Sequence, residues 1–224
     1  MAHAGENRFI NNILPKPQEA NQNLLNNYED LPLLTLEEAA GKIISHVPNV
    51  MNYVATARQK CYQHSDLLTR DESAAIYLYT MPTEFFRKLN IALRDPHRQL
   101  LKPWLDFLKL LITALKKLPS IETKIWRAVN RNATLDFIEG DVYTYWDISS
   151  WSTNISTVKP FLGDSGTLFS IQTIHGKNIA DFSAIPDEEE VILMPGTSVR
   201  ARSPSFNYGE RLFIIDLEEI NSQR

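Results

Sequence analysis

Three consecutive glutamates stand directly before a short aliphatic run in residues 187–196, whose sequence is DEEEVILMPG. An aliphatic run of this length, closed by Pro-Gly, predicts a short buried strand with the acids at its entrance. Alternate residues of a strand share a face, so Glu188 and Glu190 are expected to point one way and Glu189 the other. Two carboxylates on one face suit a cationic transition state or the binding of hydroxyl groups. The competing interpretation is a solvated acidic loop before an ordinary strand, because runs of charge usually form solvated faces.

Two further segments carry side chains that could take part in chemistry. Arg127 lies at the centre of the β-type run 124–129, KIWRAV, where a guanidinium either extends to solvent or binds an anion. Its planar fork of donors fits a phosphate. Residues 146–154, WDISSWSTN, are rich in hydroxyl groups, which can hydrogen-bond an amide, a ribose or a carboxylate. Hydroxyl clusters are also common turn residues, so neither segment alone assigns a function.

The residues before these motifs have helical patterns. Segments 35–38 (TLEE) and 69–72 (TRDE) are capping boxes, each of which opens an amphipathic run. Further helical runs cover residues 49–63 and 85–93. Apolar residues then recur at intervals of three and four over 104–118, which predicts one face of a long helix that begins at Pro103.

From about residue 122 the pattern changes to short β-type runs separated by Gly, Pro, Asn and Asp. These runs are 124–129, 142–146, 167–173, 190–193, 198–201 and 211–216. Helices followed by strands predict an α+β protein, not an alternating βαβ fold. We therefore predict an irregular N-terminal arm over residues 1–30 and a single domain over 31–224, with a helical part at 31–120 and a β-rich part at 121–224.

Composition excludes several classes of function. The formal net charge of −4 and the lack of a basic segment argue against nucleic acid as a partner. One cysteine, Cys61, excludes an internal disulfide and a cysteine-based zinc site, and favours either a reducing compartment or a disulfide-free secreted protein. The five histidines are scattered, so no metal is expected. No apolar run typical of a signal peptide opens the chain, and charged residues interrupt its most apolar stretch, so we expect a soluble intracellular protein without a membrane span.

In chain order, Arg127, Ser150 and Glu190 resemble the R-S-E signature of the mono-ADP-ribosyltransferases, which include vertebrate arginine-specific enzymes and clostridial-type toxins. The intervening segments are similar as well. They are the strand at 167–171, Gly-x-x-Ile at 176–179, Phe-Ser at 182–183 and the run from Glu188 to the Pro-Gly-Thr that ends at 197. The resemblance covers about residues 30 to 220.

The resemblance implies a helical subdomain packed on a mixed or antiparallel, β-sandwich-like NAD-binding core. It also implies that Arg127 holds an NAD phosphate and that Ser150 hydrogen-bonds Glu190 and the nicotinamide ribose region. Ser152 would support the strand edge, and Glu190 would be the catalytic acid. Glu188 would orient or deprotonate the acceptor guanidinium.

The chain departs from the family pattern at two places. Ala128 follows the arginine where the family usually has Gly, and Trp151 stands between the two serines in place of Thr. An alternative register that uses the Ser-Thr pair at 152–153 stays open. In the loop 155–166, Phe161 is predicted to stack on nicotinamide. The implied NAD-contacting set is Arg127, Ala128, Ser150, Ser152, Phe161 and Glu190.

The predicted reaction is transfer of ADP-ribose from NAD to a protein arginine, with release of nicotinamide and a side activity of NAD hydrolysis. NAD is the co-substrate, no metal is needed, and the partner is a target protein with an exposed arginine. Cleavage of the nicotinamide–ribose bond develops an oxocarbenium-like cation, which a nearby carboxylate stabilises. The alternatives are a catalytically degenerate NAD-binding or scaffold module, and a glycoside or nucleoside hydrolase that uses paired carboxylates.

Overall fold

The computed structural model describes residues 16–17, 28–61, 65–95, 99–202, 206–209 and 211–221. The chain divides into two compact units, and each is described by itself. The β unit takes its described residues from 16–17, 120–178 and 188–221. The helical unit takes them from 28–119 and 179–187, so a short segment after the longest strand belongs with the helices. Within the described ranges, no helix is both long and apolar enough to cross a membrane.

The helical unit contains α1 (Leu36–Gly41), α2 (Val50–Lys60), α3 (Arg70–Thr80), α4 (Phe85–Arg94), η2 (Lys102–Trp104), α5 (Leu105–Lys117) and η5 (Ala180–Phe182). The predicted capping boxes are confirmed at Thr35 and Thr69, each of which accepts from the backbone of the glutamate three residues later. The long helix predicted to begin at Pro103 starts as a 3-10 turn before α5. The helix predicted over 49–63 ends at Lys60, and the last two predicted residues lie outside the described ones.

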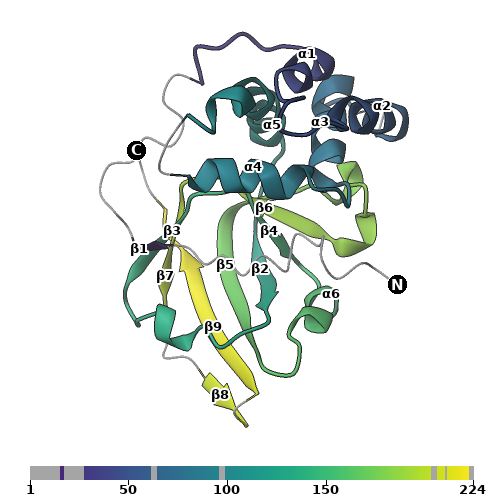
Figure 1. The fold of residues 1–224 in the computed structure, drawn as a ribbon. Coiled ribbons are helices and arrows are strands. Elements are labelled where there is room, and N and C mark those ends of the chain that lie inside the picture. The colour runs from purple at the N-terminus through teal and green to yellow at the C-terminus, as the bar shows by residue number, and fades with distance from the viewer. Residues whose placement is uncertain are drawn as a thin grey trace. The chain divides into compact units, whose positions relative to one another are not determined.

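The β unit contains β1 (Lys16–Pro17), β2 (Ser120–Val129), β3 (Val142–Tyr145), β4 (Ser149–Ser152), β5 (Gly166–Asn178), β6 (Glu190–Leu193), β7 (Thr197–Ala201), β8 (Phe206–Tyr208) and β9 (Leu212–Glu219). Its short helical segments are η3 (Thr134–Asp136), α6 (Ile155–Val158) and η4 (Lys159–Phe161), and the turn η6 (Pro186–Glu188) leads into β6. These strands form one sheet in the order β1-β3-β7-β9-β5-β2-β4-β6, with β8 added to β9 (Figure 1). The α+β class is therefore confirmed. Strand β1 lies inside the arm that the sequence predicted to be irregular.

The sheet is mixed, because β5 and β9 pair in parallel while the other pairs are antiparallel. Strand β6 pairs with β4 and also with the end of β5. Strands β2, β4, β6 and β5 are therefore joined in a closed circuit of pairings. That circuit holds β6 in place. The acidic segment, residues 187–190, ends at the first residue of this strand.

One face of the circuit is packed in an apolar core. Trp151, Val191 and Leu193 belong to this core, together with Ile125 and Phe169. Each of them is buried. Because side chains alternate along a strand, the residues between them on β4 and β6 point to the other face. Those residues include the predicted site serines and Glu190.

Candidate active site

The two predicted site acids are buried, and the acid between them is exposed. Glu190 is the first residue of β6 with 0% exposure, and Glu188 ends η6 with 9% exposure. Glu189 is exposed and has φ 46°, in the left-handed region. The sequence predicted, from strand alternation, that Glu188 and Glu190 point one way and Glu189 the other. The structure differs in its backbone, since the strand starts only at Glu190 and the chain bends at Glu189.

The serines of β4 lie across from β6 in a defined register. Ser152 is opposite Glu190, and Ser150 is opposite Ile192. Residues directly opposite each other in an antiparallel pair share a face, so Ser150, Ser152 and Glu190 line one side of the two strands. All of them are buried. The predicted partnership of Ser150 with Glu190 stays a prediction, and Ser152 is the serine whose strand position faces the acid.

Ser152 also holds the backbone of the acidic segment. Its hydroxyl donates to the carbonyl oxygen of Glu188 over 2.7 Å and accepts from the Asn154 N–H over 3.0 Å. Next to it, the Thr153 N–H donates to the Glu189 carbonyl over 3.2 Å. The end of β4 therefore contacts each of the three glutamates in turn, by a side chain, a backbone hydrogen bond or strand pairing.

Arg127, on β2, contacts other residues of β4, Ser149 and Trp151, and we call these three the arginine group. Ser150, Ser152 and Glu190 are the serine–glutamate group. Arg127 is 3% exposed, and its Nη1 donates to Ser149 Oγ over 2.7 Å. Trp151 Nε1 donates to the same oxygen over 3.0 Å, and the guanidinium carbon lies 6.0 Å from the Trp151 ring centroid. Trp126 pairs with Ser152, so these two side chains share a face. Arg127, the next residue of β2, therefore points to the opposite face. Ser149 and Ser150, adjacent in sequence, thus connect the arginine group to the serine–glutamate group.

Sequence reasoning missed Ser149 as the arginine's partner. The available signal was that a guanidinium inside an apolar strand must find a hydrogen-bond acceptor when it is buried. The hydroxyl-rich run was the obvious place for that acceptor. Which serine it would be depended on the pairing of β2 with β4, which the sequence did not predict.

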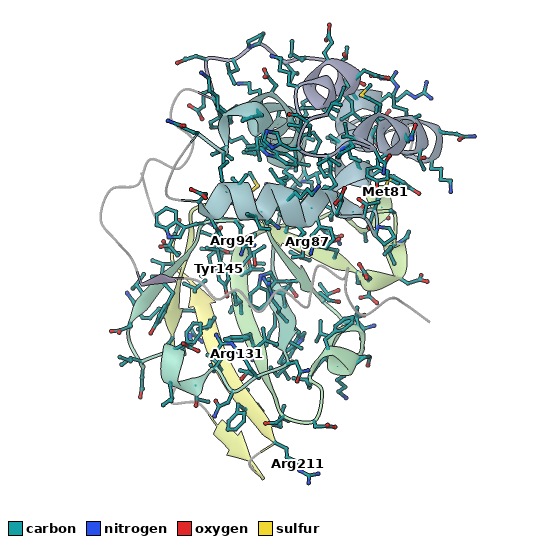
Figure 2. All side chains as sticks on the ribbon, in the orientation of Figure 1. Met81, Arg87, Arg94, Arg131, Tyr145 and Arg211 are labelled. Carbon is teal, nitrogen blue, oxygen red and sulfur yellow. The ribbon has the colours of Figure 1, made fainter. Side chains whose placement is uncertain are left out.

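Tyr145 adds a neutral aromatic hydroxyl beside the arginine group (it is labelled in Figure 2). Its ring meets the Trp151 ring edge-on, with centroids 5.8 Å apart. Burial raises the pKa of Tyr145 far above its usual value, the Arg127 charge opposes that rise, and the buried Asp147 carboxylate adds to it. The phenol therefore stays protonated and uncharged at neutral pH.

Ala128 and Phe161 pack together in a second apolar cluster with Val158 and Leu168. Ala128 is buried, while Phe161, at the end of η4, is half-buried. Ala128 lies two residues after Trp126, so it falls on the same side of β2 as the residue paired with Ser152. The structure thus places Phe161 on the serine–glutamate side through this cluster, and its contact with nicotinamide stays a prediction.

Among the residues described, no group of three or more His, Cys, Asp or Glu side chains is arranged to hold a metal ion.

Comparison with known proteins gives matches at the level of family, sequence and fold. A family model described as NAD:arginine ADP-ribosyltransferase matches residues 20–224. Erythroblast NAD(P)(+)--arginine ADP-ribosyltransferase of Gallus gallus is 29% identical over 157 residues, which are 66% of this chain and 51% of that protein. This chain therefore spans about half the length of that curated relative.

Two solved structures illustrate the fold. The eucaryotic mono-ADP-ribosyltransferase ART2.2 gives a TM-score of 0.61 at 18% identity, covering 97% of this chain and 96% of that one. The ADP-ribosyltransferase Vis of Vibrio splendidus, solved in complex with agmatine, gives 0.58 at 19% identity, covering 88% and 91%. Identities this low show a shared fold, which agrees with the predicted type of α+β core.

Proposed function

The chain belongs to the NAD:arginine ADP-ribosyltransferase family, and on that basis we propose that it transfers ADP-ribose from NAD to an arginine guanidinium, with release of nicotinamide. The target is a protein with an exposed arginine. In the absence of an acceptor, water takes its place and NAD is hydrolysed.

The observation that carries this proposal is the buried Glu190 opposite Ser152, with the buried Glu188 two residues before it. A buried carboxylate costs free energy unless its partners compensate, so a chain does not gain stability simply by burying two of them. Two buried acids on a rigid strand entrance are, however, well suited to stabilise positive charge. Both the leaving step and the acceptor of the proposed reaction carry such charge.

Each acid has one role in the proposed reaction. The bond between the ribose anomeric carbon and nicotinamide breaks, and its electron pair leaves with nicotinamide. Glu190 stabilises the resulting oxocarbenium-like ribose more than it stabilises the neutral ground state, which lowers the barrier. A guanidinium nitrogen then bonds to the anomeric carbon, and Glu188 orients the acceptor and takes up the proton that it loses.

Arg127 is proposed to hold an NAD phosphate, with Ser150 at the nicotinamide ribose, although the register of β2 with β4 directs Arg127 and Ser150 to alternate sides of their strands. A guanidinium carries five N–H donors in a planar fork, so it can bind a phosphate while keeping its hydrogen bond to Ser149. The Trp151 ring and Ser149 hold the guanidinium in place before NAD arrives. A donor held in place before binding loses little conformational entropy when the phosphate binds.

The test is transfer from labelled NAD to agmatine, a small guanidinium compound, with nicotinamide release followed in parallel. We expect Glu190→Gln to abolish both transfer and hydrolysis, because it removes the charge next to the ribose. We expect Glu188→Gln to abolish transfer while hydrolysis continues, because water needs no guanidinium-binding acid.

Glu139→Gln is the matched control, since it makes the same chemical change at an exposed acid outside the acidic segment. It should leave both rates unchanged. A native chain that binds NAD and releases no nicotinamide would favour the degenerate binding module. Hydrolysis of a glycoside or nucleoside with no action on NAD would favour the hydrolase.

A further inference from the structure

The side chain of Glu189 is held by two neutral donors from the end of β4. Thr153 Oγ1 donates to Glu189 Oε2 over 2.8 Å, and Asn154 Nδ2 donates to Glu189 Oε1 over 3.1 Å. These donors lie 36 and 35 residues away along the chain. We call Glu189, Thr153 and Asn154 the clamp.

The clamp holds a residue whose backbone conformation is unfavourable. Glu189 has φ 46°, and among the described residues it is the one non-glycine with positive φ. An L-residue with a long side chain adopts the left-handed conformation only when its surroundings compensate for the steric cost. The clamp supplies that compensation from outside the local sequence.

The bend at Glu189 affects the two site acids unequally. Glu190 is fixed by strand pairing with β4 and is completely buried, so it keeps its position without the bend. Glu188 lies outside the strand, at the end of a 3-10 turn. Ser152 holds its carbonyl, and the φ and ψ angles of Glu189 set its direction relative to β6. A return of residue 189 to negative φ would therefore rotate Glu188 relative to Glu190.

We propose that Glu189 is a positioning residue that sets the direction of the Glu188 carboxylate and thereby the partition of ADP-ribose between a guanidinium acceptor and water. The proposal rests on the function proposed above, since it assigns to Glu188 the acceptor side of the reaction. Release of nicotinamide depends on Glu190 and is unaffected by the clamp. Transfer depends on Glu188 and requires the clamp.

The chain offers a substitution that disrupts the clamp and little else. Asn154 also caps α6, where its Oδ1 accepts from the Ser156 N–H over 2.9 Å. Asp caps helices as well as Asn does, so Asn154→Asp keeps this cap. It replaces the amide donor with a carboxylate that faces the Glu189 carboxylate, and the two repel each other.

A second substitution should restore the pairing with its polarity reversed. In Asn154→Asp combined with Glu189→Gln, the new amide donates to the new carboxylate, and its oxygen still accepts from Thr153 Oγ1. Each polar group then has a partner again. This reversal distinguishes a direct contact between positions 154 and 189 from a general structural effect.

The experiment measures agmatine transfer and NAD hydrolysis by the whole chain at saturating NAD. For Asn154→Asp we expect the ratio of transfer to hydrolysis to fall about threefold to tenfold, the range that corresponds to one lost hydrogen bond. The KM for agmatine should rise, while the rate of nicotinamide release without acceptor should stay native. The double variant should regain most of the ratio.

Glu189→Gly separates the clamp from the backbone conformation, because glycine adopts positive φ without steric cost. If the clamp fixes the bend, this variant also loses transfer relative to hydrolysis, because glycine adopts negative φ as readily as positive φ and no side chain then holds residue 189 in the bend. A native ratio in Glu189→Gly or in Asn154→Asp overturns the proposal, as does an equal loss of both rates that the double variant does not rescue.

Thermal unfolding reports on the clamp without an activity measurement. The native chain, Asn154→Asp, Glu189→Gln and the double variant form a double-mutant cycle for this purpose. Coupling between positions 154 and 189 supports the contact, and its absence refutes it. If the native chain releases no nicotinamide, the proposed function fails and the positioning role fails with it, whatever the coupling.

Discussion

The Ser152 hydroxyl joins two chain segments in the interior of the β unit, so its removal should have a large effect on stability. It is completely buried, donates to the Glu188 carbonyl and accepts from the Asn154 N–H. Ser152→Ala leaves that carbonyl and that N–H without this partner, in a place where water does not reach the side chain. Each buried polar group left unsatisfied costs about 1–3 kcal/mol.

The two groups together predict a loss of about 2–6 kcal/mol in the free energy of unfolding, with the lower values if Asn154 adjusts at the strand end. For a chain of this size the corresponding fall in Tm is about 4–24 °C. Three of the four tryptophans, at positions 126, 146 and 151, lie in the β unit. Tryptophan fluorescence during urea and thermal unfolding is therefore the measurement.

Ser156→Ala serves as the control, because this serine is exposed four residues along the same segment. We expect it to change stability by less than about 0.5 kcal/mol. If Ser152→Ala also stays within about 0.5 kcal/mol of the native chain, the hydroxyl does not hold the acidic segment, and the account of how Glu188 is placed is wrong.

Two further predictions concern the core around the site. The raised pKa of Tyr145, caused mainly by burial, means that the native chain keeps a proton that the unfolded chain loses above about pH 10. The stability that this group contributes is thus complete below that pH, and above it the free energy of unfolding falls by up to about 1.4 kcal/mol per pH unit. In urea unfolding between about pH 8 and 11, Tyr145→Phe should therefore lose less stability with rising pH than the native chain. At Gly176, an added Cβ would lie 2.8 Å from Val191 Cγ1 and 2.9 Å from Thr173 Cγ2. Gly176→Ala should therefore cost about 1–3 kcal/mol in urea unfolding, whereas Gly41→Ala, with nothing within 4 Å of its added Cβ, should cost nothing; equal costs would contradict the steric explanation.

Local sequence signals predicted local structure well. The capping boxes at Thr35 and Thr69 could be predicted from the sequence because both partners of each hydrogen bond lie within four residues. The strand after the three glutamates was readable from its aliphatic run and its Pro-Gly end. The change from helical to β-type patterns near residue 120 likewise gave the α+β class.

Features that depend on distant partners were not predictable in the same way. The left-handed bend at Glu189 is stabilised by donors 35 and 36 residues earlier, so nothing in DEEEV indicates it. Arg127 finds Ser149 across 22 residues, and the choice among three nearby serines follows from strand register. The parallel pairing of β5 with β9 and the placement of β1 beside β3 are also outcomes of the whole sheet.

The closed circuit of strands affects when, during folding, Glu190 reaches its place in the sheet. Strand β6 has four residues, and both of its partners, β4 and β5, come earlier in the chain. The pairing of β6 with β4 closes the loop between Ser152 and Glu190, and closing a long loop costs entropy before the contacts of the pair form. We therefore expect Glu190 to reach its place late in folding. A chain in which β6 has not yet paired with β4 carries both acids but lacks the arrangement on which the proposed reaction depends.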